Sequence, residues 1–267
     1  MALVTCTITD GIAHVRLARP EKLNALTLPL LEELTATARR LAKDTTLRAV
    51  VLAGEGDAFC AGLDFASVLK KPAAVAKAFT PRPWRKAGTN TFQAAAWAWR
   101  EVPVPVIAAV HGHCLGGGVQ IALGADFRIA TPDSSWSVLE GKWGIIPDMS
   151  GIQSLSELIG IDRAKLLTMT AETISGTEAH ELGLVTQLDA DPVTAATALA
   201  QKLATKSPDA LAAAKRLFDD TWGRSPRRTF SRERIEQLRL LFSTNAKIAR
   251  EAAFSRTPAA YRPRAKR

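Results

Sequence analysis

Residues 105–120 read PVIAAVHGHCLGGGVQ, and this stretch decides the fold. Its first part, Val106–Val110, is a short uninterrupted apolar run, typical of a strand buried on both faces of a parallel sheet. Three glycines, Gly116–Gly118, follow, and the residues after them fit a short helix. Because no side chain covers them, the N–H groups at such a helix start favour developing negative charge on a ligand. The stretch predicts either half of an oxyanion hole or a tight turn that only brings helix and strand together.

A second bend of small residues lies earlier in the chain. The apolar run Ala49–Ala53 predicts another buried strand, and residues 58–64, which read AFCAGLD, come soon after it. Neither bend is a P-loop or a GxGxxG motif, because no Gly-Lys-Ser/Thr follows and the glycine spacing differs. The two bends are therefore the candidate site, without a nucleotide-binding fingerprint.

The elements around the bends predict an α/β fold. Val4–Ile8 and Ile12–Leu17 alternate in polarity and are separated by Asp10-Gly11, which indicates a β-hairpin. Apolar positions at helical spacing predict a helix from about Leu30 to Lys43, and Phe127–Ala130 fits another strand. Strands that alternate with helices in this way are typical of a parallel sheet covered by helices.

The second half of the chain is expected to be mostly helical. Residues 67–100 contain several prolines and predict a mobile loop followed by a helix. After Thr173, helical apolar spacing predicts four helices, at residues 177–182, 192–203, 208–222 and 232–254. We therefore expect a core at 1–195 and a helical oligomerisation region at 196–267.

Composition sets the broad class. The chain has 267 residues, of which 47% are hydrophobic, enough for one large core. No signal-peptide pattern or membrane-spanning apolar run occurs, and three cysteines without metal-ligand spacing give no disulfide framework, so we expect a cytoplasmic protein without a metal site. The formal charge of +9 would suit an anionic partner, but much of it lies after residue 200, where a solvated basic tail is expected.

Six segments, in order, resemble landmarks of the crotonase (enoyl-CoA hydratase/isomerase) superfamily. They are residues 19–26 (RPEKLNAL), 58–64 (AFCAGLD), 105–112 (PVIAAVHG), 115–118 (LGGG), 144–147 (GIIP) and 178–185 (EAHELGLV). The resemblance implies a spiral of ββα units with a helical C-terminal region, and an acyl-CoA thioester substrate. It also implies two N–H donors at Ala61 and Gly117 that stabilise an enolate oxygen. It implies no metal or redox cofactor, since coenzyme A is part of the substrate.

The resemblance leaves the reaction open. Typical hydratases carry two glutamates, and the matching positions here are Gln120, which cannot act as a base, and Glu140. A Glu followed eight residues later by an acid, here Asp148, is similar to dienoyl-CoA isomerases, which move a proton along a conjugated acyl chain. Isomerase chemistry through Glu140 and Asp148 is favoured, and a hydratase that uses Glu140, with Gln120 orienting a water, is the alternative.

The remaining expected contacts also come from the resemblance. Lys22 would contact a phosphate of coenzyme A, Ala25 and Leu63 would flank its adenine, and Arg256 would reach it from a neighbouring subunit. Phe65 and residues 67–100 would shape the acyl pocket. The full expected substrate-binding set is Gln120, Lys22, Ala25, Leu63, Asp64, Phe65, Gly116, Trp143 and Arg256. Members of the crotonase superfamily are commonly homotrimers or homohexamers, and the resemblance implies the same assembly here.

A non-enzymatic RNA-binding role is a remote alternative, because no aromatic-rich RNA-binding motif accompanies the basic residues.

Overall fold

A six-stranded sheet is the centre of the protein, in a computed structural model that describes residues 2–83 and 87–266. The strand order is β1-β2-β3-β4-β6-β9, and every neighbouring pair after the first is parallel. The strands are β1 (Val4–Thr9), β2 (Ile12–Leu17), β3 (Ala49–Gly54), β4 (Val106–Val110), β6 (Phe127–Ala130) and β9 (Gln187–Leu188). The predicted strands are all present, and the predicted α/β class is confirmed.

The first two strands form the predicted hairpin. Val4 pairs with Leu17 and Thr9 with Ile12, so the connection is the two-residue turn Asp10-Gly11. Both turn residues have positive φ, 51° and 76°, as a type I′ turn requires. Register and turn chemistry therefore agree, and the hairpin closes one edge of the sheet.

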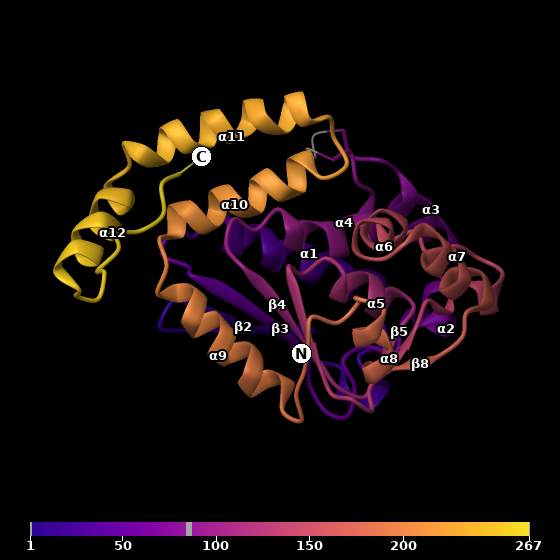
Figure 1. The fold of residues 1–267 in the computed structure, drawn as a ribbon. Coiled ribbons are helices and arrows are strands. Elements are labelled where there is room, and N and C mark those ends of the chain that lie inside the picture. The colour runs from indigo at the N-terminus through magenta and orange to yellow at the C-terminus, as the bar shows by residue number, and fades with distance from the viewer. Residues whose placement is uncertain (1, 84–86, 267) are drawn as a thin grey trace.

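Helices cover both faces of this sheet (Figure 1). Val50 and Leu52 of β3 face a core shared with α1 (Leu28–Lys43) and α4 (Thr91–Arg100). Val51 and Ala53 face the opposite core, which includes Ala196 and Ala200 of α9 (Pro192–Ala204). This two-sided burial explains the uninterrupted apolar run of β3. The boundary proposed at residue 195 falls inside α9, which packs on the sheet.

A smaller sheet continues the chain beyond the ends of β4 and β6. It consists of β5 (His113–Leu115), β7 (Ser135–Ser137) and β8 (Ile174–Ser175), in that order. β4 leads through the bend at Gly112 into β5 and then into α5 (Gly117–Ala122), while β6 leads into β7. The repetition of two strands and a helix is the predicted ββα spiral.

Residues 67–100 are more helical than predicted. Two short helices, α2 (Phe65–Val68) and α3 (Pro72–Phe79), precede α4. Pro72 did not prevent helix formation because it occupies the first turn of α3, where its missing N–H has no intrahelical acceptor. The expectation of a loop was wrong for residues 72–79, and residues 84–86 of the expected loop lie outside the described part of the chain.

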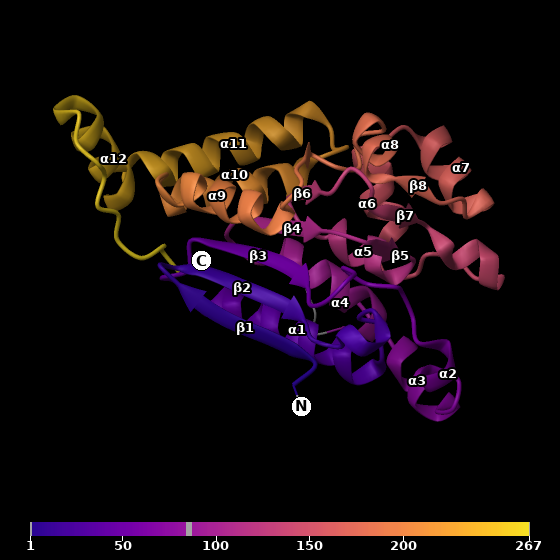
Figure 2. The ribbon, with the colours of Figure 1, turned by 90° about the horizontal axis from the view of Figure 1, so that it is seen from below.

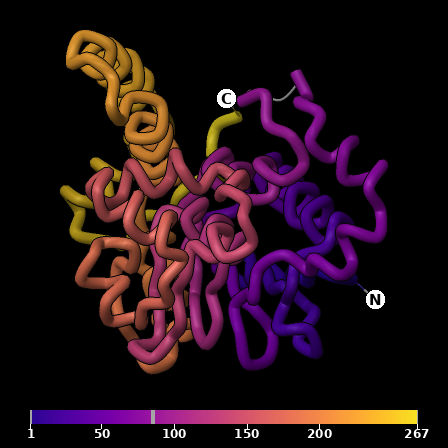
Figure 3. Tube along the Cα trace, turned by 90° about the vertical axis from the view of Figure 1, so that its right-hand side faces the viewer, coloured from indigo at the N-terminus to yellow at the C-terminus, as the bar shows by residue number. Residues whose placement is uncertain are grey.

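The predicted helix at 232–254 is instead two helices, α11 (Pro226–Leu241) and α12 (Thr244–Ser255). Ser243 interrupts the helix, and its side chain accepts a hydrogen bond from the Ala246 N–H at 3.2 Å, which caps α12. Figure 3 shows that the orange helices of this C-terminal part project beyond the rest of the chain. The other helices are α6 (Gly151–Leu158), α7 (Ile161–Thr170), α8 (Gly176–Glu181) and α10 (Pro208–Thr221).

Most basic side chains of the tail are exposed, as expected, including Arg256, Arg262 and Lys266, but Arg264 is an exception. Arg264 is only 6% exposed, and its backbone N–H donates to Thr45 O at 2.8 Å. Its guanidinium donates to Ala42 O at 3.3 Å, and Asp209 accepts from the Ala265 N–H at 2.8 Å. In the described parts of the chain, 2–83 and 87–266, no helix combines the length and apolar character needed to cross a membrane.

Candidate active site

The two bends predicted to form the site lie against one another. Cys60 of the first bend and Cys114 of the second form a parallel bridge. The Cys60 N–H donates to His113 O at 2.8 Å, and the Leu115 N–H donates to Cys60 O at 2.9 Å. A β-carbon at Gly118 would lie 2.6 Å from Cys60 O, so only glycine permits this approach. The bends are thus joined by backbone contacts and cannot separate independently.

The available backbone donors differ from the predicted pair at one position. The Ala61 N–H donates to Leu23 O at 2.9 Å and is therefore already used inside the protein. The N–H groups of Leu63 and Gly117 have no acceptor among the residues that the structure describes. The expectation for Ala61 was wrong because sequence spacing does not show which amide of a bend is used internally. Leu63 takes its place beside Gly117.

Both bends and both predicted carboxylates line one cavity of about 230 Å³. Apolar side chains form most of its wall, among them Leu69, Val75, Phe79, Leu139 and Ile145. The remaining lining residues are Ala61, Gly62, Leu63, Phe65, Val68, Phe92, Gly116, Gly117, Glu140, Trp143, Asp148 and Met149. A largely apolar cavity with a few polar groups is typical of small-molecule sites.

Glu140 stands in a turn of 3₁₀ helix, η2 (Leu139–Trp143), and its side chain is buried, with the residue 7% exposed. Its Oε1 accepts a hydrogen bond from Gln120 Nε2 at 2.6 Å, while its Oε2 has no hydrogen-bond partner in the described part of the chain. Burial, with a smaller contribution from the charge of Asp148, raises the pKa of Glu140. A carboxyl group with a raised pKa and one free oxygen is suited to proton transfer.

Gln120 does not reach the cavity, contrary to its predicted role in substrate or water binding. It is 1% exposed, and it holds Glu140 instead. Its Oε1 accepts from the N–H groups of Met149 at 2.7 Å and Gly151 at 2.9 Å. Both the oxygen and the nitrogen of the amide are therefore bonded inside the protein, and Gln120 is absent from the cavity lining.

Asp148 supplies the second acidic group of the cavity. It is half-buried, and burial raises its pKa. It precedes a turn in which Ser150 has a φ of 69°, a conformation that is uncommon for a residue other than glycine. Two carboxylic acids in one cavity, each with a raised pKa, form a candidate acid–base pair.

The chain is similar in sequence to known proteins. The profile of the Enoyl-CoA hydratase/isomerase family matches residues 7–253. The chain belongs to this family. A relative from Mycobacterium bovis named "Probable enoyl-CoA hydratase" is 32% identical over 219 residues, which cover 82% of this chain and 83% of the relative. The mitochondrial Delta(3,5)-Delta(2,4)-dienoyl-CoA isomerase of Mus musculus is 35% identical over 214 residues, covering 76% of this chain and 64% of the relative.

The fold is shared over nearly the whole length. A solved structure of an enoyl-CoA hydratase from Bacillus anthracis superposes with a TM-score of 0.87 at 29% sequence identity, covering 97% of this chain and 99% of the other. The crotonase fold predicted from the ordered segments is therefore confirmed. Relatives with either activity in their names occur at similar identity, so overall similarity gives the family and leaves the reaction to the residues of the site.

Several other expected residues of this enoyl-CoA hydratase/isomerase fold line the cavity. The Phe65 and Trp143 rings lie 4.8 Å apart between centroids and form part of its rim, and Gly116 lies in its wall. Asp64 has a different position from the one expected, because its carboxylate pairs with Arg19 at 3.1 Å and accepts from the Ser67 N–H to cap α2. It is absent from the cavity lining, so its observed role is to hold α2.

Of the expected contacts to coenzyme A, Leu63 lines the cavity, whereas Lys22, Ala25 and Arg256 lie outside it. Lys22 is exposed in the 3₁₀ helix η1 (Pro20–Lys22), and Ala25 follows it near the first bend, where Ala25 O accepts from Arg19 at 2.7 Å. Arg256 follows α12, and Figures 1 and 2 show α12 and the α2–α3 segment at opposite ends of the molecule. Arg256 therefore does not line this cavity.

The cysteines at the bends are buried packing residues. Burial raises the pKa of Cys60 to about 12, and it raises that of Cys114 well above its usual range. Thiols in this state are poor nucleophiles, because the thiolate is the reactive form.

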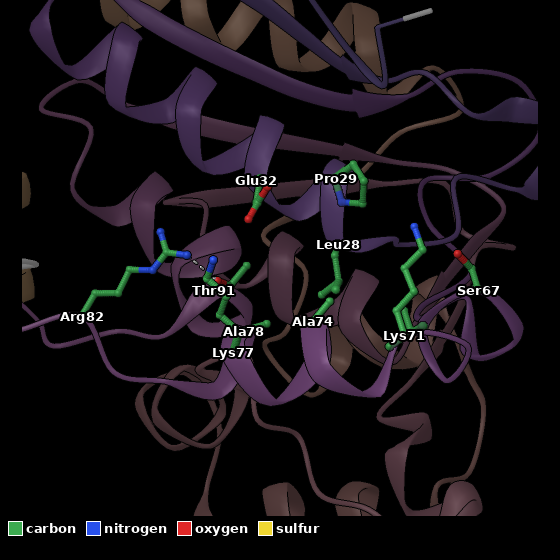
Figure 4. A pocket seen from close by; sticks show the side chains of 11 residues that line it. Leu28, Pro29, Glu32, Ser67, Lys71, Ala74, Lys77, Ala78, Arg82 and Thr91 are labelled. Carbon is green, nitrogen blue, oxygen red and sulfur yellow. Dashed lines mark hydrogen bonds between the residues drawn. The ribbon is translucent and has the colours of Figure 1, made fainter.

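Behind α3 lies a second cavity of about 300 Å³ (Figure 4). Its cationic side chains are Lys71, Lys77 and Arg82, and Arg82 donates to the Thr91 hydroxyl at 3.2 Å. The two cavities share Val68 in their walls, while the bends and the carboxylates belong to the first one only.

The sequence did not indicate most of the apolar wall as individual residues. Val68, Leu69, Val75, Phe79 and Phe92 all come from the segment expected to shape the acyl pocket, but apolar side chains there could equally have packed in a core. Met149 and the Leu63 amide also gave no signal, because their importance depends on which neighbours they meet.

Proposed function

We propose that this chain isomerises a conjugated double bond of an acyl-CoA thioester through an enolate. The observation that carries the proposal is the presence of the free Leu63 and Gly117 amides in one apolar cavity with Glu140 and Asp148. The thioester oxygen would accept hydrogen bonds from the two amides. Such preorganised donors are most valuable where negative charge develops in the transition state.

The two carboxyl groups would divide the proton transfer between them. In a 3,5-dienoyl-CoA, one carboxylate removes a proton from C2, and the electrons delocalise over the chain onto the thioester oxygen. The other group, as a carboxylic acid, protonates C6, and the double bonds become 2,4. The reaction consumes no water and needs no redox partner. Raised pKa values at Glu140 and Asp148 support such roles, because each group must exchange a proton near neutral pH.

Hydration of an enoyl-CoA is the second candidate, and the names of several relatives favour it. In that reaction Glu140 would act on water and the α-carbon. The buried Gln120 amide weighs against it, because Gln120 neither ionises nor reaches the cavity. Glu140 would then have to activate water without a second carboxylate at that position.

The test offers crotonyl-CoA and a 3,5-dienoyl-CoA to one enzyme preparation and follows the absorbance of each chromophore, with product identification. Isomerisation is supported if the 2,4-dienoyl product accumulates with a kcat/KM at least tenfold above that for hydration. Faster formation of the 3-hydroxyacyl product would replace the proposal with the hydratase. Incubation in D2O gives a further check, since isomerisation through exchangeable carboxyls introduces deuterium at C6.

We further propose that the chain acts in the cytoplasm as a homotrimer or homohexamer built through its helical region at 196–267. In such an assembly Arg256 of one subunit would contact the coenzyme A bound by another, while Lys22 and Ala25 would contact it within the subunit. The exposed position of Lys22 and the projection of the C-terminal helices support this arrangement (Figure 3). An RNA-binding role is not favoured, because the basic tail is partly committed to internal hydrogen bonds.

A further inference from the structure

We propose that Gln120 is a positioning residue whose single amide group sets the orientation of Glu140 and, at the same time, the place of the 148–151 turn that carries Asp148. The proposal rests on the proposed function, in which both carboxyl groups take part in proton transfer. It adds that their relative position is fixed from behind the cavity wall, by a residue that does not touch the substrate.

The hydrogen bonds of the Gln120 amide allow only one orientation. Its oxygen accepts from two backbone N–H groups, of Met149 and Gly151, which can only donate. The amide nitrogen must therefore face the Glu140 carboxyl, where it lies 2.6 Å from Oε1. A flipped amide would bring its NH2 group against two N–H donors and leave the Glu140 oxygen facing another oxygen.

This arrangement presents Glu140 with one oxygen held and the other free. Oε1 is bound by Gln120, and Oε2 has no partner among the described residues. An N–H donor can keep its bond to Oε1 whether Glu140 is ionised or protonated at Oε2. Gln120 can therefore hold the side chain in one rotamer throughout a cycle of proton loss and gain.

The same amide oxygen organises the turn that follows Asp148. A β-carbon at Gly151 would lie 2.6 Å from Gln120 Oε1, so the turn is closed tightly around this oxygen. Ser150, between the two donors, has positive φ, and the bonds on either side help to hold that uncommon conformation. Because Met149 directly follows Asp148, the amide also limits how far Asp148 can move from Glu140.

The electrostatic surroundings of Glu140 are simple. Burial and, to a smaller extent, the charge of Asp148 disfavour its ionisation, whereas a backbone hydrogen bond and the hydrogen bond from Gln120 favour it. Loss of the donor should therefore raise the pKa of Glu140 further, because a hydrogen bond to the ionised carboxylate stabilises its charged form.

The experiment measures the ionisation of Glu140 in the free protein by infrared difference titration, with Glu140→Gln identifying its carboxyl band. Gln120→Met keeps the side-chain length without the hydrogen bonds, and Gln120→Glu keeps the shape but replaces the donor by an oxygen. We expect both to raise the pKa of Glu140, the second by more, because two oxygens about 2.6 Å apart must share a proton. For Gln120→Met we expect kcat on the dienoyl-CoA to fall about 10- to 100-fold, with KM changed less than threefold.

Gln153→Met is the matched control. Gln153 Nε2 donates to Glu157 Oε1 at 2.5 Å in exposed positions of α6, so it removes a similar Gln–Glu bond outside the cavity. The control should leave the Glu140 titration and kcat unchanged. If Gln120→Met does not fold, Gly151→Ala takes its place, because its β-carbon would displace the amide oxygen and should shift the titration in the same direction.

An unchanged Glu140 titration in folded Gln120→Met and Gln120→Glu proteins overturns the positioning role. A shifted titration together with unchanged kcat overturns its importance for turnover. The proposed function fails separately: if the natural enzyme does not isomerise a dienoyl-CoA, the infrared titration of the free protein still tests the Gln120 contacts.

Discussion

Replacing Leu63 by proline removes one backbone N–H from the cavity and leaves the other donor in place. In the described part of the chain this N–H makes no hydrogen bond, so its loss breaks no native hydrogen bond, although the leucine side chain that packs against the core is replaced as well. Leu63 forms a parallel bridge with Leu26, an extended conformation that proline tolerates, and Gly62 before it has the freedom that the residue before a proline needs. The variant is expected to fold.

The expected effect is catalytic and large. Loss of one donor from a two-donor oxyanion hole lowers kcat by about 10² to 10³-fold, or roughly 3–4 kcal/mol of transition-state stabilisation. Substrate binding should change much less, because the ground-state carbonyl carries little charge. The assay compares kcat and KM on the preferred acyl-CoA and follows the thioester carbonyl stretch of a bound substrate analogue, which should move toward its frequency in water.

Ala61→Pro is the matched comparison. Its N–H already donates to Leu23 O at 2.9 Å, so this change removes a structural hydrogen bond worth about 1 kcal/mol net, and more if Leu23 O is left unsatisfied. We expect a lower melting temperature for Ala61→Pro. Wherever this variant stays folded, the carbonyl stretch of the bound analogue should stay close to its frequency in the natural protein. Two results would refute the assignment of the donors. One is full turnover by a folded Leu63→Pro protein, and the other is a carbonyl stretch that moves toward its frequency in water in Ala61→Pro but not in Leu63→Pro.

Three further predictions concern the carboxyl groups and the bends. Glu140→Gln and Asp148→Asn should each lower kcat by about 10² to 10⁴-fold with a modest change in KM, and equal activity of Asp148→Asn would leave a reaction that uses Glu140 alone. Because burial raises the pKa of Glu140 in the folded state, its contribution to stability is present at low pH and is lost as the pH rises through that pKa. Glu140→Gln should therefore raise the melting temperature relative to the natural protein at pH 8 by a few degrees, with the gain disappearing near pH 4, as measured by calorimetry. Gly118→Ala places a β-carbon 2.6 Å from Cys60 O and should cost about 1–3 kcal/mol in urea unfolding.

Local signals predicted most of the fold. Strands β3 and β4 were evident because both faces are buried, and the first hairpin was evident because Asp10-Gly11 accepts positive φ. Errors arose where local signals conflicted. Pro72 indicated a loop but stands at a helix start, and the apolar spacing across 232–254 gave no sign of the break at Ser243.

For the site, the sequence by itself determined which residue types are present: the glycines of the bends, the carboxyls of Glu140 and Asp148, and the amide of Gln120 in place of an acid. These are consequences of composition and order, and they sufficed to identify the family. Only the tertiary structure decided which groups are free to act. The Ala61 N–H is consumed by Leu23, the Leu63 N–H is not, and Gln120 faces the protein interior. The reason is that hydrogen-bond satisfaction depends on partners distant in sequence, which no local pattern encodes.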